Sequence, residues 1–264
     1  MLEKIGIVGI GYVGQAIYDC YTEKGFEVVT VDVDQNKSNG TYKDLMSCKG
    51  VFVCVPSPDN GDGTCDTSIL DAVLYLLKDY KNVIISKTTA PPDFYERMQT
   101  IYPNLVHVPE FLTAVNAYED FTNQKNAIIG GYILSYQTEA ERILKLSQPI
   151  KNTIFCRIGE AALIKYMINS FLATKVVFMN EAAMLADSLG YQWENLYKML
   201  DFDSRVGQGH AQVPGPDGQY GFGGMCFPKD TAAMIQFAKK KGIEMDVLKT
   251  AVKKNLLLRL QKPK

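Results

Sequence analysis

Residues 221–231, which read GFGGMCFPKDT, place a thiol, an ammonium and a carboxylate close together in the chain. Positive charge or a helix N-terminus beside a thiol favours the thiolate, which is the nucleophilic form, and Lys229 and a helix predicted after Pro228 would supply both. Asp230 adds a group that can carry a proton. The alternative is that Cys226 is inert, because a cysteine on its own is more often a small buried hydrophobe.

A second pair of polar side chains lies on a long predicted helix. Residues 159–189 contain no internal proline or glycine and keep a helical apolar pattern, which would give about 45 Å of helix if it is unbroken. Lys165 and Asn169 are four residues apart and therefore share a face of this helix. The alternative is that both side chains simply point to solvent.

The N-terminal residues predict a dinucleotide site. A short apolar strand leads into GIGYVG and a helical pattern, and a second strand ends in Asp32. Gly9 would make the turn, Gly11 would let the backbone reach the pyrophosphate, and Gly14 would pack the helix on the strand. Asp32 would accept hydrogen bonds from the ribose hydroxyls and repel a 2′-phosphate, which predicts NAD rather than NADP. The alternative is a glycine-rich turn in some other α/β protein.

Polar residues also follow the later predicted strands, and the carboxyl ends of parallel strands are where such sheets bind ligands. Pro56 follows the third strand, Thr89 the fourth and Glu110 the fifth. From spacing alone, Thr89 and Glu110 could equally be helix caps or turn formers. The predicted strands span residues 4–8, 27–31, 50–55, 82–86, 104–108, 126–130 and 152–156. The predicted cofactor contacts are Gly9, Gly11, Tyr12, Val13, Gly14, Asp32, Pro56 and Thr89.

The alternation of strands and helices predicts an α/β fold: a Rossmann-type doubly wound parallel sheet at residues 1–156, followed by an all-helical domain at residues 157–264. The 28 basic and 29 acidic residues create no field for nucleic acid or an anionic membrane, so small ligands are expected. Neither a signal peptide nor an apolar run near ~20 residues is found, which predicts a cytoplasmic protein. Six scattered cysteines and two histidines suggest neither disulfides nor a metal site.

Taken together, the motifs resemble the UDP-glucose/GDP-mannose dehydrogenase family over nearly the whole chain. They are GIGYVG, VCVPSP, SKTTAPP, VPEFL, EAALIKYMINSFLATKVVFMNE, DFDSRVG and GFGGMCFPKDT. The resemblance implies oxidation of the primary alcohol of a nucleotide sugar to a carboxylate with two molecules of NAD, through a cysteine thiohemiacetal and thioester. It further implies a short form of the family, without the C-terminal nucleotide-binding domain.

The resemblance also assigns residues. Cys226 would be the nucleophile, Lys165 and Asn169 would steady the oxyanion, Asp230 and Glu110 would handle protons and the hydrolytic water, and Thr89 would line the site. The substrate contacts it implies are Phe111, Leu112, Lys165, Arg205, Gly223 and Lys229. A homodimer is expected on the long helix at residues 159–189, with Arg205 reaching the partner's active site.

Departures from the family pattern leave two other functions open. Val108 and Met225 stand where the family usually has an asparagine and a serine. A two-electron NAD-dependent hydroxy-acid dehydrogenase shares the cofactor fold and a central-helix lysine and asparagine, and would not need Cys226. A non-catalytic NAD-binding partner subunit is the third possibility.

Overall fold

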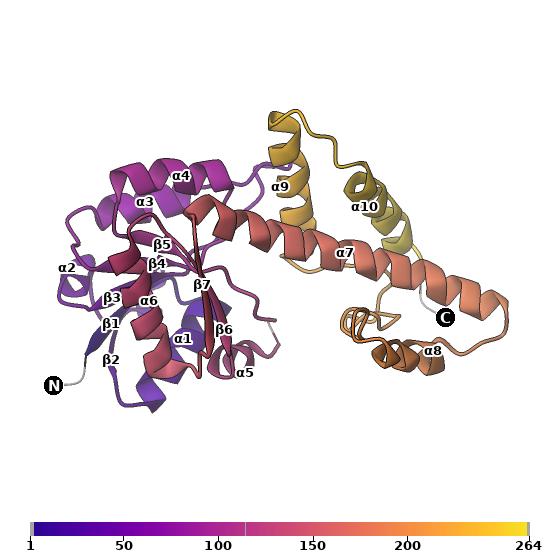
Figure 1. The fold of residues 1–264 in the computed structure, drawn as a ribbon, viewed down its shortest axis with the longest axis horizontal. Coiled ribbons are helices and arrows are strands. Elements are labelled where there is room, and N and C mark those ends of the chain that lie inside the picture. Colours follow the sequence, from indigo (N-terminus) through magenta and orange to yellow (C-terminus); the bar gives the residue numbers. More distant parts are fainter. Residues whose placement is uncertain (1–2, 114, 263–264) are drawn as a thin grey trace. The chain divides into compact units, whose positions relative to one another are not determined.

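The computed structural model describes residues 3–113 and 115–262 (Figure 1). The chain forms two compact units, Met1–Pro58 with Cys65–Lys165, and Asp59–Thr64 with Tyr166–Lys264. We call them the sheet unit and the helical unit. The boundary between them lies inside the longest helix, whereas the sequence pattern put it directly before that helix. The loop Asp59–Thr64 belongs with the helical unit, where Gln236 Nε2 donates to Asp62 O at 3.0 Å.

The sheet unit contains seven strands in the order β2-β1-β3-β4-β5-β6-β7. Neighbouring strands are parallel except for β5 and β6, which pair antiparallel with His107 opposite Gly130. The predicted Rossmann-type sheet is confirmed, with this one reversal near its edge. The connection from β5 to β6 carries only a short helix, which suits an antiparallel step better than a full crossover. The strands are β1 Lys4–Val8, β2 Glu27–Val31, β3 Gly50–Val53, β4 Val83–Ser86, β5 Leu105–His107, β6 Asn126–Gly130 and β7 Asn152–Cys156.

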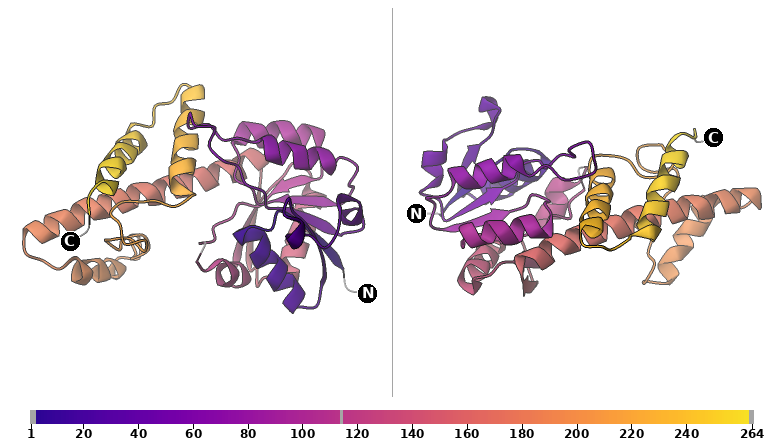
Figure 2. Two further views of the ribbon diagram at one scale, coloured as in Figure 1. Left: turned by 180° about the vertical axis from the view of Figure 1, so that it is seen from behind. Right: turned by 90° about the horizontal axis from the view of Figure 1, so that it is seen from above.

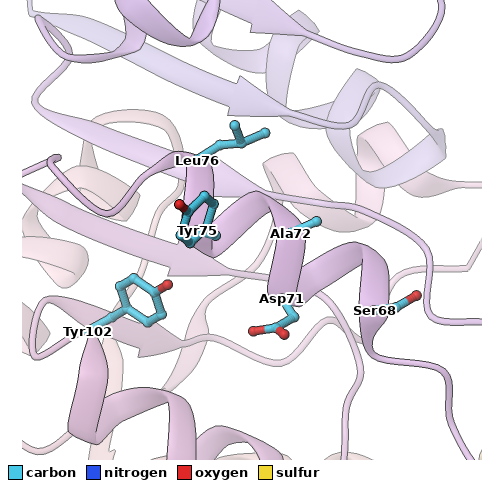
Figure 3. Close-up of a pocket in the computed structure, with 6 residues that line it drawn as sticks. All are labelled: Ser68, Asp71, Ala72, Tyr75, Leu76 and Tyr102. Atoms are coloured by element: carbon cyan, nitrogen blue, oxygen red, sulfur yellow. The ribbon is translucent and has the colours of Figure 1, made fainter.

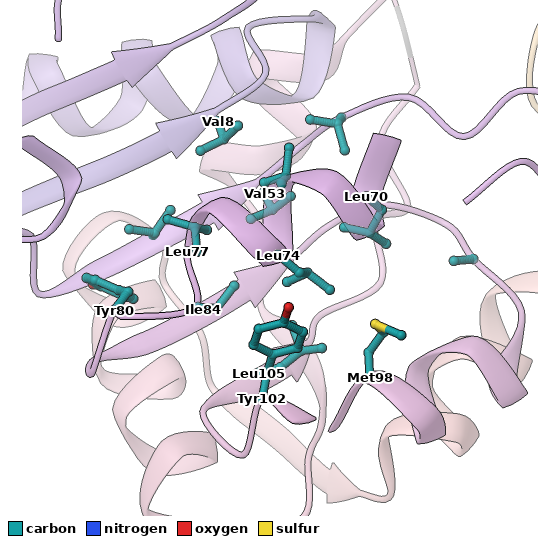
Figure 4. Packing of buried hydrophobic residues seen from close by; sticks show 14 of the residues in the cluster. Val8, Val53, Leu70, Leu74, Leu77, Tyr80, Ile84, Met98, Tyr102 and Leu105 are labelled. Carbon is teal, nitrogen blue, oxygen red and sulfur yellow. The ribbon is translucent and has the colours of Figure 1, made fainter. Parts of the chain in front are cut away.

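Two hydrophobic cores cover the two faces of this sheet, because successive strand residues point to opposite faces. Ile5 and Ile7 of β1 pack in one core, and Val8 packs in the other. One core includes residues of α1 Tyr12–Glu23, α5 Ala117–Thr122 and α6 Leu134–Ser147. The other includes residues of α2 Tyr42–Leu45, α3 Ser68–Leu76 and α4 Pro92–Ile101. Figure 4 shows Leu74 of α3 and Met98 of α4 in this core, and Figure 2 shows the course of the chain in two further views. A short 3-10 helix, η1 Gln35–Lys37, follows β2.

The helical unit has a much smaller core. It contains Ala173, Val177, Phe222, Ala251 and Leu258, with four partly buried apolar side chains packed against them. The predicted helical second part with one long helix is confirmed. Its helices are the C-terminal part of α7 Ile158–Ser188, then α8 Trp193–Met199, η2 Leu200–Phe202, α9 Phe227–Lys240 and α10 Asp246–Arg259.

The long helix α7 is apolar enough to cross a membrane by length and composition alone. Its most apolar 18-residue window has a mean hydropathy of 1.3, and 44% of that window is buried inside the protein. The helix also carries Lys165, Asn169 and Asn180 as buried side chains. Buried polar groups with protein partners are expected on the core helix of a folded domain, so we treat α7 as a core helix.

Candidate active site

The glycine turn after β1 has the geometry that the dinucleotide motif requires. Gly9 has a φ of +91°, and a Cβ there would lie 2.8 Å from the carbonyl oxygen of Cys54. A Cβ on Gly14 would lie 2.0 Å from Gly9 O, whereas a Cβ on Gly11 would meet nothing within 4 Å. Gly9 and Gly14 are therefore glycines for close packing, and Gly11 faces open space that a ligand can enter.

The start of α1 can hold an anion. Gly11 is the N-cap of α1, no side chain caps this end, and the first turn contains no acidic residue. The first N–H groups of a helix lack partners within the helix, and the helix dipole favours negative charge there. These features fit the pyrophosphate of a dinucleotide. Tyr12 and Val13 are the first two residues of this turn, as predicted for the cofactor contacts.

Asp32 stands at the end of β2 and is held in place by the turn itself. Its Oδ2 accepts a hydrogen bond from the Ile10 N–H at 2.5 Å, and its Oδ1 accepts one from the Asp34 N–H at 2.9 Å. Burial opposes ionisation, but the hydrogen bonds from Ile10 and Asp34, with Lys37 nearby, hold the pKa of Asp32 below its usual value. The carboxylate is thus fixed as an anion beside the glycine turn.

The segments after β3 and β4 are tied to each other by hydroxyl groups. Ser57 Oγ donates to Thr89 O at 2.6 Å, and Thr88 Oγ1 donates to Val55 O at 2.9 Å. Pro56 is exposed beside them. Thr89 is no helix cap, because the N-cap of α4 is Pro91. One of the two alternatives for Thr89 is therefore excluded, and the position remains available to a ligand.

Spacing left open whether Glu110 is a turn former or a functional residue, and in the structure it has features of both. Its Oε1 accepts hydrogen bonds from the N–H groups of Phe111 and Leu112 at 2.8 and 3.2 Å, so the side chain does form a turn. The carboxylate is also buried, and its Oε2 lies 2.8 Å from Lys87 Nζ in an ion pair whose side chains are 7% and 1% exposed. A buried carboxylate is stabilised by such an ammonium.

Lys165 does not point to solvent. Its side chain is buried, its ammonium donates to the main-chain oxygen of Glu110, and it lies 5.2 Å from the centre of the Phe111 ring. A cavity of about 380 Å³ is lined partly by Glu110, Phe111 and Leu112. The sheet unit has a larger surface cavity of about 490 Å³ between α3 and Tyr102, but none of the predicted site residues lines it (Figure 3). We therefore take the smaller cavity, which predicted site residues line, as the candidate binding pocket of the sheet unit.

The helical unit contains the second half of the predicted residues. Asp230 is almost completely buried, and its Oδ2 accepts a hydrogen bond from Asn169 Nδ2 at 2.5 Å. Its Oδ1 lies 2.6 Å from Lys229 Nζ. Asn169 is also buried, so the alternative of a solvent-facing side chain is excluded for it as well. Together these residues form a compact group of a carboxylate, an amide and an ammonium.

Cys226 is the N-cap residue of α9, so the helix begins directly after the thiol. Its carbonyl oxygen accepts the Asp230 N–H at 2.8 Å, which places the two residues on the same first turn. The side chain is partly exposed, which does not match an inert core cysteine. The Lys229 ammonium, which the sequence predicts beside the thiol, donates to the Asp230 carboxylate on the same turn.

Gly223 and Arg205 also belong to the helical unit. Gly223 lies against the Arg259 guanidinium, because a Cβ on Gly223 would be 2.8 Å from Arg259 Nη2. Arg205 is 88% exposed in its side chain and forms an ion pair with Asp203 at 2.6 Å. Among the described residues of this unit, its guanidinium therefore contacts its own loop, and most of its surface is available to a ligand or a second chain.

The structure adds polar residues that sequence reasoning did not select. Lys87 was read only as part of a motif, although a lysine directly after a buried apolar strand is itself a signal, since such a position is rarely exposed. Asn180 and Asn255 also escaped notice. Each lies inside an apolar helical pattern, where a buried asparagine requires hydrogen-bond partners.

A dinucleotide turn on a Rossmann-type sheet, joined to a helical unit that carries a cysteine at a helix start, defines the class of fold. Residues 37–148 match the NAD binding domain of the UDP-glucose/GDP-mannose dehydrogenase family, and residues 159–256 match its central domain. The chain belongs to the UDP-glucose/GDP-mannose dehydrogenase family. NAD is the cofactor of the matched domain, in agreement with the prediction, and the uncapped start of α1 and Asp32 fit it.

Individual proteins and solved structures are also similar to this chain. UDP-glucose 6-dehydrogenase TuaD of Bacillus subtilis is 26% identical over 96% of this chain and 63% of its own length, so the chain spans less than two thirds of that relative. The fold is similar to that of a UDP-glucose dehydrogenase from Pyrobaculum islandicum, with a TM-score of 0.82, 24% identity, and 97% and 68% of the two chains covered. It is also similar to 3-hydroxyisobutyrate dehydrogenase from Mycobacterium tuberculosis, with a TM-score of 0.75, 16% identity, and 96% and 92% covered.

Proposed function

We propose that the chain carries out NAD-dependent oxidation of the primary alcohol of a nucleotide sugar, of the UDP-glucose or GDP-mannose type, to a carboxylate. The observation that supports this most is the buried hydrogen bond from Asn169 of α7 to Asp230, which lies on the first turn of α9 directly after Cys226. A two-electron alcohol oxidation does not need a thiol. Oxidation of the resulting aldehyde does, unless water adds instead, because the aldehyde carbon must first become tetrahedral.

The steps on Cys226 follow from that requirement. Bound NAD would accept a hydride in each of the two oxidations. The Cys226 sulfur would add to the aldehyde carbon, and the former carbonyl oxygen would take up a proton, which gives a thiohemiacetal. Loss of the second hydride and of that proton leaves a thioester. Attack by water then breaks the sulfur–carbon bond and releases the carboxylate and the thiol.

Lys165 and Asn169 would donate to the oxygen of the tetrahedral species. They are one turn apart on α7, and an ammonium has three N–H groups and an amide has two, so both side chains are of a type that donates to an oxyanion. Such preorganised donors are typically worth ~10²–10³ in rate. Asp230, one turn from the thiol, would take the proton from Cys226.

Glu110 would act on the hydrolytic water, with Thr89 lining the same region. The carboxylate is fixed by two N–H groups and by Lys87, so it needs no reorganisation before it acts. The residues predicted to contact the substrate are Phe111, Leu112 and Lys165 in the sheet unit, and Arg205, Gly223 and Lys229 in the helical unit.

The cofactor would lie on the glycine turn. The pyrophosphate would meet the N–H groups at the start of α1, and Gly11 would allow its approach. Asp32 would bind the ribose hydroxyls, which excludes the 2′-phosphate of NADP. Pro56 and Thr89 would border the cofactor at the neighbouring strand ends.

We further propose a homodimer built on α7. Four large apolar side chains, Met167, Phe171, Phe178 and Leu185, are exposed on this helix at spacings of four and seven residues, which puts them on one face. A second copy of the chain would cover this stripe, and the exposed Arg205 would then reach the partner's substrate. We expect light scattering to give a dimer at micromolar concentration. A monomer near 29.4 kDa would contradict the proposal.

We further propose that the protein is located in the cytoplasm.

A two-electron hydroxy-acid dehydrogenase is the second candidate, because the fold is also similar to 3-hydroxyisobutyrate dehydrogenase over almost all of that chain. A non-catalytic NAD-binding subunit is the third. Steady-state NADH formation with UDP-glucose, GDP-mannose and small hydroxy acids separates the three. Our proposal predicts two NADH per sugar nucleotide consumed, the second candidate predicts one NADH per hydroxy acid, and the third predicts none.

A further inference from the structure

Residues 221–224, which lead to Cys226, form an irregular segment whose first two residues are buried. Gly221 and Phe222 are both buried, although neither lies in a helix or strand. Buried main-chain N–H and C=O groups must find partners, and here no sheet or helix supplies them. Gly223 and Gly224 then separate Phe222 from the cysteine motif, and glycines do not fix a backbone path by themselves. The path to Cys226 must therefore be fixed by groups outside the segment.

Asn255 on α10 supplies two of these groups. Its Oδ1 accepts the Phe222 N–H at 2.6 Å, and its Nδ2 donates to Phe222 O at 3.0 Å. One side-chain amide thus satisfies both main-chain groups of one residue, as a neighbouring strand would. The contact is close, because a Cβ on Gly221 would lie 2.3 Å from the Asn255 Oδ1. Position 221 has to be glycine for this reason and for its φ of +72°.

Asn180 on α7 supplies a third contact. Its Oδ1 accepts the Gly221 N–H at 3.0 Å, and its Nδ2 donates to Val176 O at 2.8 Å, one turn back on the same helix. The amide is therefore oriented by α7 before it holds the segment. Asn180 and Asn255 are both buried, so water does not compete for these hydrogen bonds.

Arg259 adds a weaker contact one turn after Asn255. Its Nη1 lies 2.7 Å from Asp217 Oδ2, and its Nη2 lies against Gly223. This ion pair is partly exposed, so we expect it to contribute less than the buried amides. All these contacts belong to the helical unit and reach the segment from two different helices.

We propose that Asn255 and Asn180 are positioning residues for Cys226, which fix the backbone before the thiol so that Cys226 begins α9 in a single orientation. This inference rests on the proposed function, in which Cys226 is the nucleophile. Its structural part, the bracing of the segment, stands apart from any activity. The positioning part predicts an effect on the chemical step rather than on cofactor binding, since the glycine turn and Asp32 lie in the sheet unit.

The bracing is tested by amide hydrogen exchange, measured residue by residue by NMR. In Asn255→Ala the Phe222 amide should exchange at least about tenfold faster, whereas the Gly221 amide, still held by Asn180, should change less. In Asn180→Ala the pattern should be reversed. Asn195→Ala, at an exposed asparagine of α8, serves as the control and should leave both amides unchanged. If each variant raises the exchange rates of both amides equally, or if neither variant changes either rate, the proposed bracing is wrong.

The positioning is tested by kinetics with UDP-glucose as the probe. Asn255→Ala should lower kcat by up to about 100-fold with a smaller change in KM, because a misplaced nucleophile mainly affects the chemical step. NAD affinity, followed by fluorescence, should stay within about twofold of wild type. Asn255→Gln keeps both the acceptor and the donor on a side chain that is one methylene longer, so its kcat should lie between those of wild type and Asn255→Ala. This graded response also decides the question if Asn255→Ala fails to fold.

The possible failures are distinguishable. If wild-type protein forms no NADH with UDP-glucose or the other sugar nucleotides, the proposed function fails, and the exchange pattern still decides the bracing. If wild-type protein is active and Asn255→Ala shows faster Phe222 exchange with unchanged kcat, Asn255 has a structural effect only, and the positioning inference is overturned.

Discussion

The sheet unit and the helical unit hold their functional residues by different means. In the sheet unit, two cores of buried apolar side chains fix the strands, and the site residues lie at the strand ends. In the helical unit, the apolar cluster that packs around Phe222 is smaller, with five buried members, and buried amides hold the segment that leads to Cys226. The difference teaches that the sheet unit combines two large apolar cores with polar contacts at its strand ends, whereas the irregular segment before Cys226 depends mainly on individual polar contacts.

The largest effect that we expect from this comparison is a loss of kcat when a catalytic residue of the helical unit is replaced. Asp230→Asn should lower kcat by about 10²–10⁴-fold, because it removes a proton acceptor and leaves Lys229 without its anionic partner. NAD affinity should remain unchanged. Asp246→Asn, at an exposed position in the first turn of α10, is the control. Steady-state kinetics measure kcat, and fluorescence titration measures NAD affinity. Equal losses of the two would contradict the assignment of catalysis to the helical unit and of NAD binding to the sheet unit.

The packing of the sheet unit predicts the next largest effect. Leu74→Ala should lower the free energy of unfolding by about 2–5 kcal/mol, because Leu74 is completely buried in the core on one face of the sheet (Figure 4). Leu76→Ala, two residues later on α3 and exposed, should cost less than about 1 kcal/mol. Urea denaturation followed by circular dichroism gives both values. Similar losses for the two variants would contradict the packing account.

The two histidines allow the pH dependence of the units to be separated. Burial, together with the nearby Lys87 and Lys165, lowers the pKa of His107 to about 3, although the hydrogen bond with Ser86 O opposes the shift. The unfolded chain therefore binds a proton that the folded protein does not. Stability from this group is complete above about pH 6.5 and is lost as the pH falls toward 3, by about 1.4 kcal/mol per pH unit.

His107→Gln should remove this contribution, and His210→Gln, at the exposed histidine of the helical unit, should retain it. Denaturation curves at pH 7, 6 and 5 provide the test. If the stability of the His107→Gln variant falls with pH as steeply as that of wild type, the buried neutral histidine is not the cause.

The smallest predicted effect concerns cofactor choice. Asp32→Ser should weaken NAD binding by about tenfold, because it removes hydrogen bonds to the ribose, and should narrow the preference for NAD over NADP. Ser38, whose hydroxyl accepts the Asp32 N–H, offers Ser38→Ala as a nearby control that keeps the carboxylate. Fluorescence titration with both cofactors measures the preference. Wild-type protein that binds NADP as tightly as NAD would overturn the assignment of Asp32.

The fold and the cofactor turn could be predicted from the sequence because their signals are local. The strands at residues 4–8 and 27–31, the glycine spacing and the position of Asp32 all lie within one supersecondary unit, and β1 and β2 have the predicted bounds. The reversal of β6 could not be predicted in this way, because strand direction depends on the length and packing of the connection and not on the apolar pattern of the strand.

The candidate site was only partly predictable. Cys226, Asp230 and Asn169 were found by motif, but their contacts were not, since the pairing of Asp230 with Asn169 joins residues 61 positions apart. The short sequence distance predicts the Lys229 ammonium beside the thiol, but it does not predict the contact of this ammonium with the adjacent Asp230 carboxylate. Partners that arise only in three dimensions, such as Lys87 for Glu110 and Asn255 for Phe222, leave no periodic signal in the chain.

The central claim is that Cys226 is needed for the second oxidation and not for the first. The most direct measurement is mass spectrometry of protein quenched during turnover of the active sugar nucleotide, combined with NADH counted per substrate, for wild type and Cys226→Ser. We expect an acyl adduct on Cys226 and two NADH per substrate in wild type. In the variant we expect no adduct, retained NAD binding, and slow formation of aldehyde without carboxylate. Two NADH per substrate at the wild-type rate in Cys226→Ser would contradict the thioester mechanism.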